Sequence, residues 1–222
     1  MQARSVLTLT VGLLLSGCSS GPKYRIDDQT LAQVPLAEKQ GMMSAQQEQL
    51  QAKEELRKAN ADFDQTDREL DIASNEYKAA KLALDSAELN KKSAEQMGDI
   101  NKKNEAAREV HVAGMGVKTG DAKVSWLEKK RKMFKLDREA AEAHVSAADA
   151  KYELEKAKLA AARGIKPSEN FNVMDFETES LNKMQKYSEA KLEADRKRPD
   201  VDDLERRFMA LNQEYSTARQ GR

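Results

Sequence analysis

The 222-residue chain has one cysteine, ten glycines, four prolines and only 5% aromatic residues. A single cysteine excludes an internal disulfide and a metal site built from several thiolates. The 38 basic and 38 acidic side chains balance, so charge gives no reason to expect nucleic-acid binding. Few aromatic residues are poor material for a thick globular core, and stability must therefore come from long packed elements.

The longest apolar run is short and lies at the start of the chain. Arg4 precedes residues 6–15, an apolar stretch within the length expected of a signal-peptide core. A helix that spans a bilayer needs about 20 such residues. The start is therefore typical of a secretory signal peptide.

The only cysteine directly follows this run. Leu15, Ser16, Gly17 and Cys18 form an aliphatic residue, two small residues and a cysteine. This tetrad resembles the lipobox of bacterial lipoproteins. The resemblance implies that residues 1–17 are removed and that lipid is attached to the Cys18 sulfur and to the new amino terminus. Several acyl chains together make a stable membrane anchor, and this covalent lipid is the only cofactor-like group expected.

The residues after the cysteine bear on the location of the protein. In Gram-negative lipoproteins an aspartate at this place favours retention in the inner membrane, whereas Ser19 and Ser20 stand here. The resemblance therefore implies a cell-envelope protein anchored in the outer membrane and facing the periplasm. In a Gram-positive source it would lie on the outer face of the only membrane.

Residues 18–43 are expected to form a lipidated, flexible tether. Gly21, Pro22, Pro35 and Gly41 interrupt regular structure there, and no apolar spacing is sustained.

A heptad repeat begins after the tether. Large apolar residues recur every seventh position from Leu56, and small residues recur three positions later. A repeat sustained for more than four heptads predicts a coiled coil, and its alternation of large and small residues favours an antiparallel neighbour. The predicted seam consists of Leu56, Ala59, Phe63, Leu70, Ala73, Tyr77, Ala80 and Leu84.

Glycine and proline divide the helical region, residues 44–198. The cluster Gly114, Gly116 and Gly120 predicts a hairpin turn at residues 113–120. A second break is expected at residues 164–170, where Gly164 can cap a helix and Pro167 prevents its continuation. Pro199 is expected to separate a short amphipathic helix and tail, residues 199–222.

These patterns predict an all-α fold, an elongated antiparallel helical hairpin or coiled coil with a broken return arm. With a turn near residue 117 the second helix is too short to match the first. The third helix could then cover residues 45–70, the favoured arrangement, or fold back into a three-helix bundle. The heptads could also pair between two copies of the chain.

Two features could contact a partner. Trp126 is the only tryptophan, and the turn prediction places it at the hairpin end or exposed at its tip. The run Lys129, Lys130, Arg131 and Lys132 could touch an anionic surface, although such runs are more often solvated helix faces. No metal-ligand or catalytic spacing is present, so we expect no metal and no enzyme activity.

The sequence therefore predicts a non-enzymatic, lipid-anchored scaffold, spacer or adaptor for another envelope protein. The alternative is a periplasmic chaperone or carrier that holds unfolded clients or lipid between its helical arms.

Overall fold

The computed structural model describes residues 22–221, which form an all-α fold and contain no strand. The prediction of fold class is confirmed. None of the described helices combines the length and the apolar character needed to cross a membrane. The elements are two short 3₁₀ helices, η1 (Asp28–Leu31) and η2 (Leu36–Glu38), and three long helices, α1 (Gln40–Met97), α2 (Ile100–Ala162) and α3 (Val173–Gln220).

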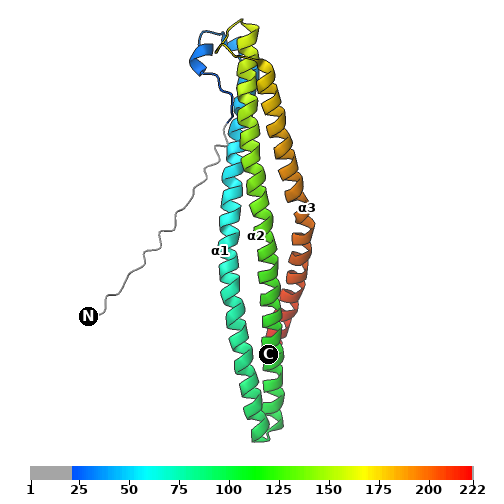
Figure 1. Ribbon diagram of the computed structural model, residues 1–222. Helices are drawn as coiled ribbons and strands as arrows, with labels where there is room; N and C mark the ends of the chain where they lie inside the picture. The colour runs from blue at the N-terminus through cyan, green and yellow to red at the C-terminus, as the bar shows by residue number, and fades with distance from the viewer. Residues whose placement is uncertain (1–21, 222) are drawn as a thin grey trace, which may run out of the picture.

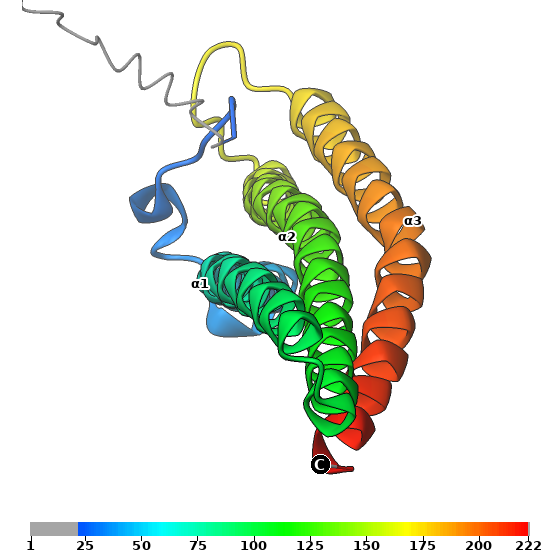
Figure 2. The ribbon, with the colours of Figure 1, turned by 90° about the horizontal axis from the view of Figure 1, so that it is seen from below.

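Helix α2 is the centre of an elongated bundle. It packs antiparallel to α1 on one side and to α3 on the other, while α1 and α3 splay apart (Figures 1 and 2). The 58 residues of α1 and 63 of α2 each make a rod of about 90 Å. Because α2 matches α1 along its length, α3 is not needed to cover residues 45–70. The favoured arrangement is wrong, and α3 folds back along α2.

The α1 residues buried against its neighbours are small. They occupy one position of the predicted heptad, while the large residues Leu56, Phe63, Leu70, Tyr77 and Leu84 are half-buried beside them. A row of small side chains lets the two helix axes approach closely. The buried residues of α1 are Ala45, Ala52, Thr66, Ala73, Ala87 and Ala94, and Ala59 and Ala80 are partly buried.

Helix α2 buries small residues on two faces because it has neighbours on both sides. Its buried alanines include adjacent pairs, Ala140 with Ala141 and Ala147 with Ala148. Consecutive helix positions point about 100° apart, so such a pair serves two different contacts. His144 links all three helices, since its Nδ1 lies 2.7 Å from Glu55 Oε2 on α1 and its ring stacks on Tyr187 of α3.

The predicted hairpin turn is in the wrong place. Residues 113–120 lie inside α2, and the chain turns instead at Gly98 and Asp99. Gly98 takes a left-handed conformation with φ of 78°, which glycine adopts without strain. The Asp99 carboxylate then caps α2 by accepting hydrogen bonds from the backbone N–H groups of Asn101 and Lys102.

Two glycines of the misassigned cluster serve close packing within the bundle. A Cβ on Gly120 would lie 3.2 Å from Tyr77 Cδ2 and 3.3 Å from Tyr77 Cα. A Cβ on Gly116 would lie 3.2 Å from the hydroxyl of Tyr215. These glycines therefore leave room for tyrosines of α1 and α3, and they do not end the helix.

The second predicted break is present between α2 and α3. Gly164 is left-handed with φ of 68°, its N–H donates to Ala161 O, and the Ile165 N–H donates to Ala160 O. This is the Schellman pattern of hydrogen bonds that closes a helix end. Asn172 then caps α3 through a bond from the Met174 N–H to its side chain.

Pro199 does not end a helix, contrary to the sequence prediction. Helix α3 runs through it, and the helix is visibly curved (Figure 1). Proline lacks an N–H and often bends a helix. The buried residues Ala194 and Val201 flank it, so packing on α2 continues across the bend.

We expect alanine to have opposite effects at Gly120 and Gly114. Gly114→Ala should raise the free energy of unfolding by about 1 kcal/mol, because nothing lies within 4 Å of the added Cβ and alanine favours the helix. Gly120→Ala should lower it by about 1 kcal/mol, because the Tyr77 backbone must move. Urea unfolding followed by circular dichroism measures both, and equal changes would contradict the close approach.

Candidate functional site

The amino-terminal described segment, residues 22–38, is packed on the bundle and is called the strap here. It crosses the end of the bundle opposite the Gly98 turn (Figure 1). Residues 18–43 were predicted to be a flexible tether, and for residues 22–43 this is wrong: the strap contains η1 and η2, and α1 already begins at Gln40. Cys18 and the lipobox residues Leu15, Ser16 and Gly17 lie outside the described residues.

Apolar residues of the strap fill the space that alanines leave on α2. Ile26 and Leu31 are almost fully buried, and Val34 is 8% exposed. They pack with Phe176 of α3 and the buried alanines Ala157 and Ala160. The cluster holds larger side chains than the rest of the bundle, and it ties the strap to both α2 and α3.

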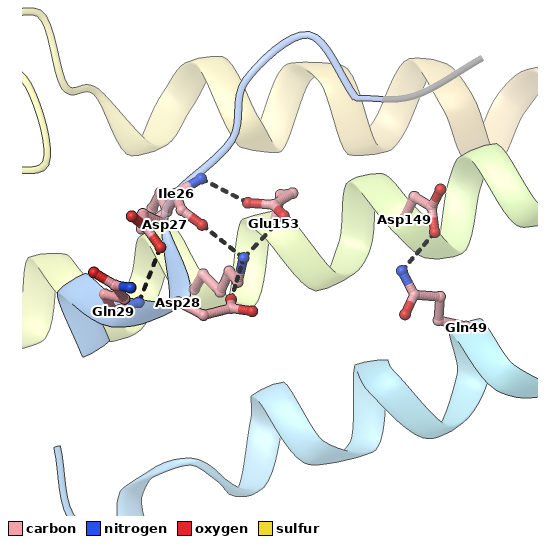
Figure 3. Close-up of polar contacts among 8 residues, drawn as sticks. Ile26, Asp27, Asp28, Gln29, Gln49, Asp149 and Glu153 are labelled. Carbon is pink, nitrogen blue, oxygen red and sulfur yellow. Dashed lines mark hydrogen bonds and ion pairs between the residues drawn. The ribbon is translucent and has the colours of Figure 1, made fainter. Parts of the chain in front are cut away.

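A buried ion pair fastens the middle of the strap to α2 (Figure 3). Lys156 is 4% exposed and Glu153 8% exposed, and they lie 3.0 Å apart. Each also binds the strap backbone: Lys156 Nζ donates to Ile26 O at 2.7 Å, and the Ile26 N–H donates to Glu153 Oε2 at 2.8 Å. Asp28 adds a carboxylate oxygen 2.6 Å from Lys156 Nζ.

These contacts keep Lys156 charged. Burial alone lowers the pKa of the ammonium, but its hydrogen bonds to Asp28 and Glu153 outweigh burial and raise the pKa above its ordinary 10.5. A raised pKa in the folded state adds stability that is complete below pH 10.5 and is lost only as the pH rises through the folded value. The Lys156 contribution to strap attachment therefore persists through the neutral range.

Further contacts hold the two ends of the strap. The N–H groups of Lys23 and Tyr24 donate to the Glu179 carboxylate of α3, at 2.6 and 3.2 Å. At the other end Arg163 pairs with Glu38, with Nε 2.6 Å from Oε2. The strap is thus bonded to α2, to α3 and to the loop between them.

The residues predicted to contact a partner mostly face the bundle. Trp126 lies midway along the rod, not at the hairpin end, and stacks on Phe208 with ring centroids 5.4 Å apart. Lys130 lies 3.6 Å from Glu69, and Arg131 lies 2.5 Å from Asp67. Lys129 and Lys132 are exposed and have no ion-pair partner among the described residues.

No group of three His, Cys, Asp or Glu side chains within residues 22–221 is arranged to hold a metal ion. Several hollows of the described surface are open grooves between helices, and one lies between the strap and the loop before α3. Two of the grooves lie between α2 and α3 in the half of α3 towards its carboxyl end. Comparison of the chain with known protein families, with curated proteins and with solved structures gave no match.

Sequence reasoning missed the strap. Only three of its apolar residues are buried, and their spacing is not sustained. The pair Glu153 and Lys156 looks like any exposed pair three residues apart on a helix. The signal that was present is the spacing of Ile26, Leu31 and Val34 beside Asp27, which caps η1 by accepting from the Gln29 N–H.

Replacement of Lys156 should release the strap. Lys156→Met leaves the Glu153 carboxylate buried without its cation and removes the donor to Ile26 O, a loss of about 3 kcal/mol or more. Amide hydrogen exchange in residues 22–38 should accelerate while the middle of α2 stays protected.

The matched control is Lys158→Met, because Lys158 is half-exposed and, among residues 22–221, forms an ion pair with Glu155 alone. It should leave exchange in the strap unchanged. Unchanged exchange in Lys156→Met as well would show that the apolar cluster and the contacts at the two ends of the strap hold it without Lys156.

Proposed function

We propose that this chain is a non-enzymatic, lipid-anchored spacer of the bacterial cell envelope that presents a rigid helical rod to another envelope protein. The observation that carries the proposal is the docking of the strap at the end of the rod opposite the Gly98 turn. The strap begins a few residues after the predicted lipid site at Cys18.

Chain length limits how far the rod can lie from the membrane. Five peptide units join Cys18 to Lys23, and they span at most about 18 Å. Lys23 is bonded to α3 through Glu179. A lipid on Cys18 would therefore hold the strap end of the rod close to the membrane surface.

The opposite end of the rod would then lie far from the anchor. Ile26 contacts α2 at Glu153, and α2 begins at Ile100, so the Gly98 turn lies about 80 Å from the strap. The three long helices are only weakly amphipathic over their full lengths. A helix needs a strongly apolar face opposite a polar one to lie in the membrane interface, so we expect the rod to project from the surface.

The surface is also better suited to binding a protein partner than to catalysing a reaction. The described part of the bundle offers long grooves and a distal turn, geometry that fits the side-by-side packing of another helix. Ser19 and Ser20 favour the outer membrane, facing the periplasm, as the location. The chaperone or carrier alternative gains no specific support from these open grooves.

Lipid anchoring is tested at the cysteine. Cys18→Ser should move the protein from the membrane fraction to the soluble or precursor fraction, because the acylated sulfur is lost. Mass spectrometry of the purified proteins should show diacylglycerol on the protein that keeps Cys18 and none on Cys18→Ser. Ser20→Ala, which leaves the lipobox intact, is the control and should stay acylated. An acylated Cys18→Ser protein would refute the anchor.

The spacer role is tested at the turn. A photoreactive residue at Met97, which is 66% exposed beside Gly98, should cross-link in intact cells to one dominant protein. The same residue at Leu50, 61% exposed on α1 nearer the strap, is the matched control and should give less of that product. A broad set of unfolded outer-membrane proteins at both positions would contradict the spacer and favour the chaperone.

A further inference from the structure

Two hollows between α2 and α3 join into one groove. Their volumes are about 760 and 560 Å³, and both are lined by Lys118, Ala210 and Leu211. No residue of α1 lines either hollow. We call this surface the outer groove. It extends along residues 204–218 of α3, a length of about 20 Å.

The floor of the outer groove is apolar and partly open. Met115 and Ala122 of α2 and Leu204 and Leu211 of α3 are all half-buried. Ala210 beside them is exposed. Such a floor gains free energy when a second surface covers it.

Four charged residues stand on the walls of the groove, one pair on each helix. Lys118 and Asp121 belong to α2, and Arg207 and Glu214 belong to α3. All four are exposed, and none forms an ion pair with another described residue. Their charges are therefore available to a partner.

The heights of these charges along the rod follow from the packing of α2 on α3. Thr119 Oγ1 donates to Leu211 O at 3.3 Å, and Gly116 lies beside Tyr215. Because the helices are antiparallel, Lys118 and Glu214 lie at nearly the same height. Asp121 and Arg207 follow one to two turns further towards the strap, also at nearly the same height. Each height thus carries a positive charge on one wall and a negative charge on the other.

We propose that the partner at this groove is a second copy of the chain, packed parallel with outer groove against outer groove. A two-fold axis along the rods places α2 of one copy opposite α3 of the other at equal height. Lys118 of each copy then faces Glu214 of the other, and Asp121 faces Arg207. Four ion pairs would surround the two apolar floors, and complementary charges of this kind fix the register of an interface.

The parallel orientation rests on the proposed function. A two-fold axis across the rods would also bring opposite charges together, Lys118 to Asp121 and Arg207 to Glu214. It would place the two straps at opposite ends, however, whereas both copies would be anchored to one membrane. The groove is short, so the dimer should be weak in solution, and attachment to a membrane raises the local concentration that forms it.

Distance measurements on tethered protein test the orientation. Residues 19–222, which include every described residue, are attached through an amino-terminal histidine tag to vesicles with nickel-chelating lipid. Asn104→Cys, exposed near the Gly98 turn, carries a nitroxide label. Double electron–electron resonance should report a distance between copies of about 20 to 30 Å in the parallel dimer. A distance of about 50 Å would mean antiparallel packing and would overturn the proposal. The absence of any distance between copies, which means a monomer, would also overturn it.

Charge exchange tests the groove itself. Lys118→Glu alone and Glu214→Lys alone should each weaken the dimer about tenfold or more, because like charges then face each other. A mixture of the two variants should recover the dimer. In a mixed dimer one site pairs the two substituted side chains, the other pairs the native Lys118 with the native Glu214, and both sites then join opposite charges.

The control for these variants is Lys129→Glu, exposed on α2 outside the groove, which should have no effect. Single variants that dimerise normally, or a mixture that does not recover, would overturn the proposal. This outcome is distinct from failure of the anchor, because the vesicle tether replaces the lipid and acylation of Cys18 is measured separately.

Discussion

The close approach of α1 and α3 to α2 is the constraint on which the rest of the structure depends. Alanines at one heptad position of α1, and on two faces of α2, keep the helix axes near one another. Small side chains bury little apolar area each, so the bundle gains stability from the number of contacts along a rod of about 90 Å. The design fixes α2 as the central helix and leaves the larger apolar residues half-exposed at the flanks, where grooves remain.

The sequence allowed prediction of the features that repeat. The all-α fold, the antiparallel neighbour of α1 and the break after Gly164 follow from periodicity and capping chemistry, both of which are local. The position of the first turn does not follow from periodicity or capping chemistry. Gly116 and Gly120 look like turn residues until Tyr215 and Tyr77 are known to lie against them, and those contacts are distant in sequence. The adjacent alanines of α2 are a sequence signal that could have been used. They indicate two packed faces on α2, and a second packed face requires α3 beside α2.

The strap could not be predicted for a different reason. Its two prolines and the glycines that flank it in the sequence resemble a flexible linker. It is nevertheless docked by three buried apolar residues, one buried ion pair and hydrogen bonds at both ends. The ion pair is invisible in sequence because a lysine and a glutamate three residues apart occur on most exposed helices. Only the backbone of Ile26, which both side chains bind, distinguishes this pair. These contacts fix residues 22–38, which were predicted to be a tether, at one defined place on the rod.

The strap contacts also imply an order of folding. The bond between Ile26 and Glu153 joins residues 127 positions apart, whereas the Gly98 turn brings neighbouring segments of α1 and α2 together at once. Loop closure over long separations costs more entropy and is slower than local pairing. The hairpin should therefore form from the turn outward and the strap should dock last. During synthesis, residues 22–38 would therefore stay undocked until α2 is complete, although they precede it in the chain.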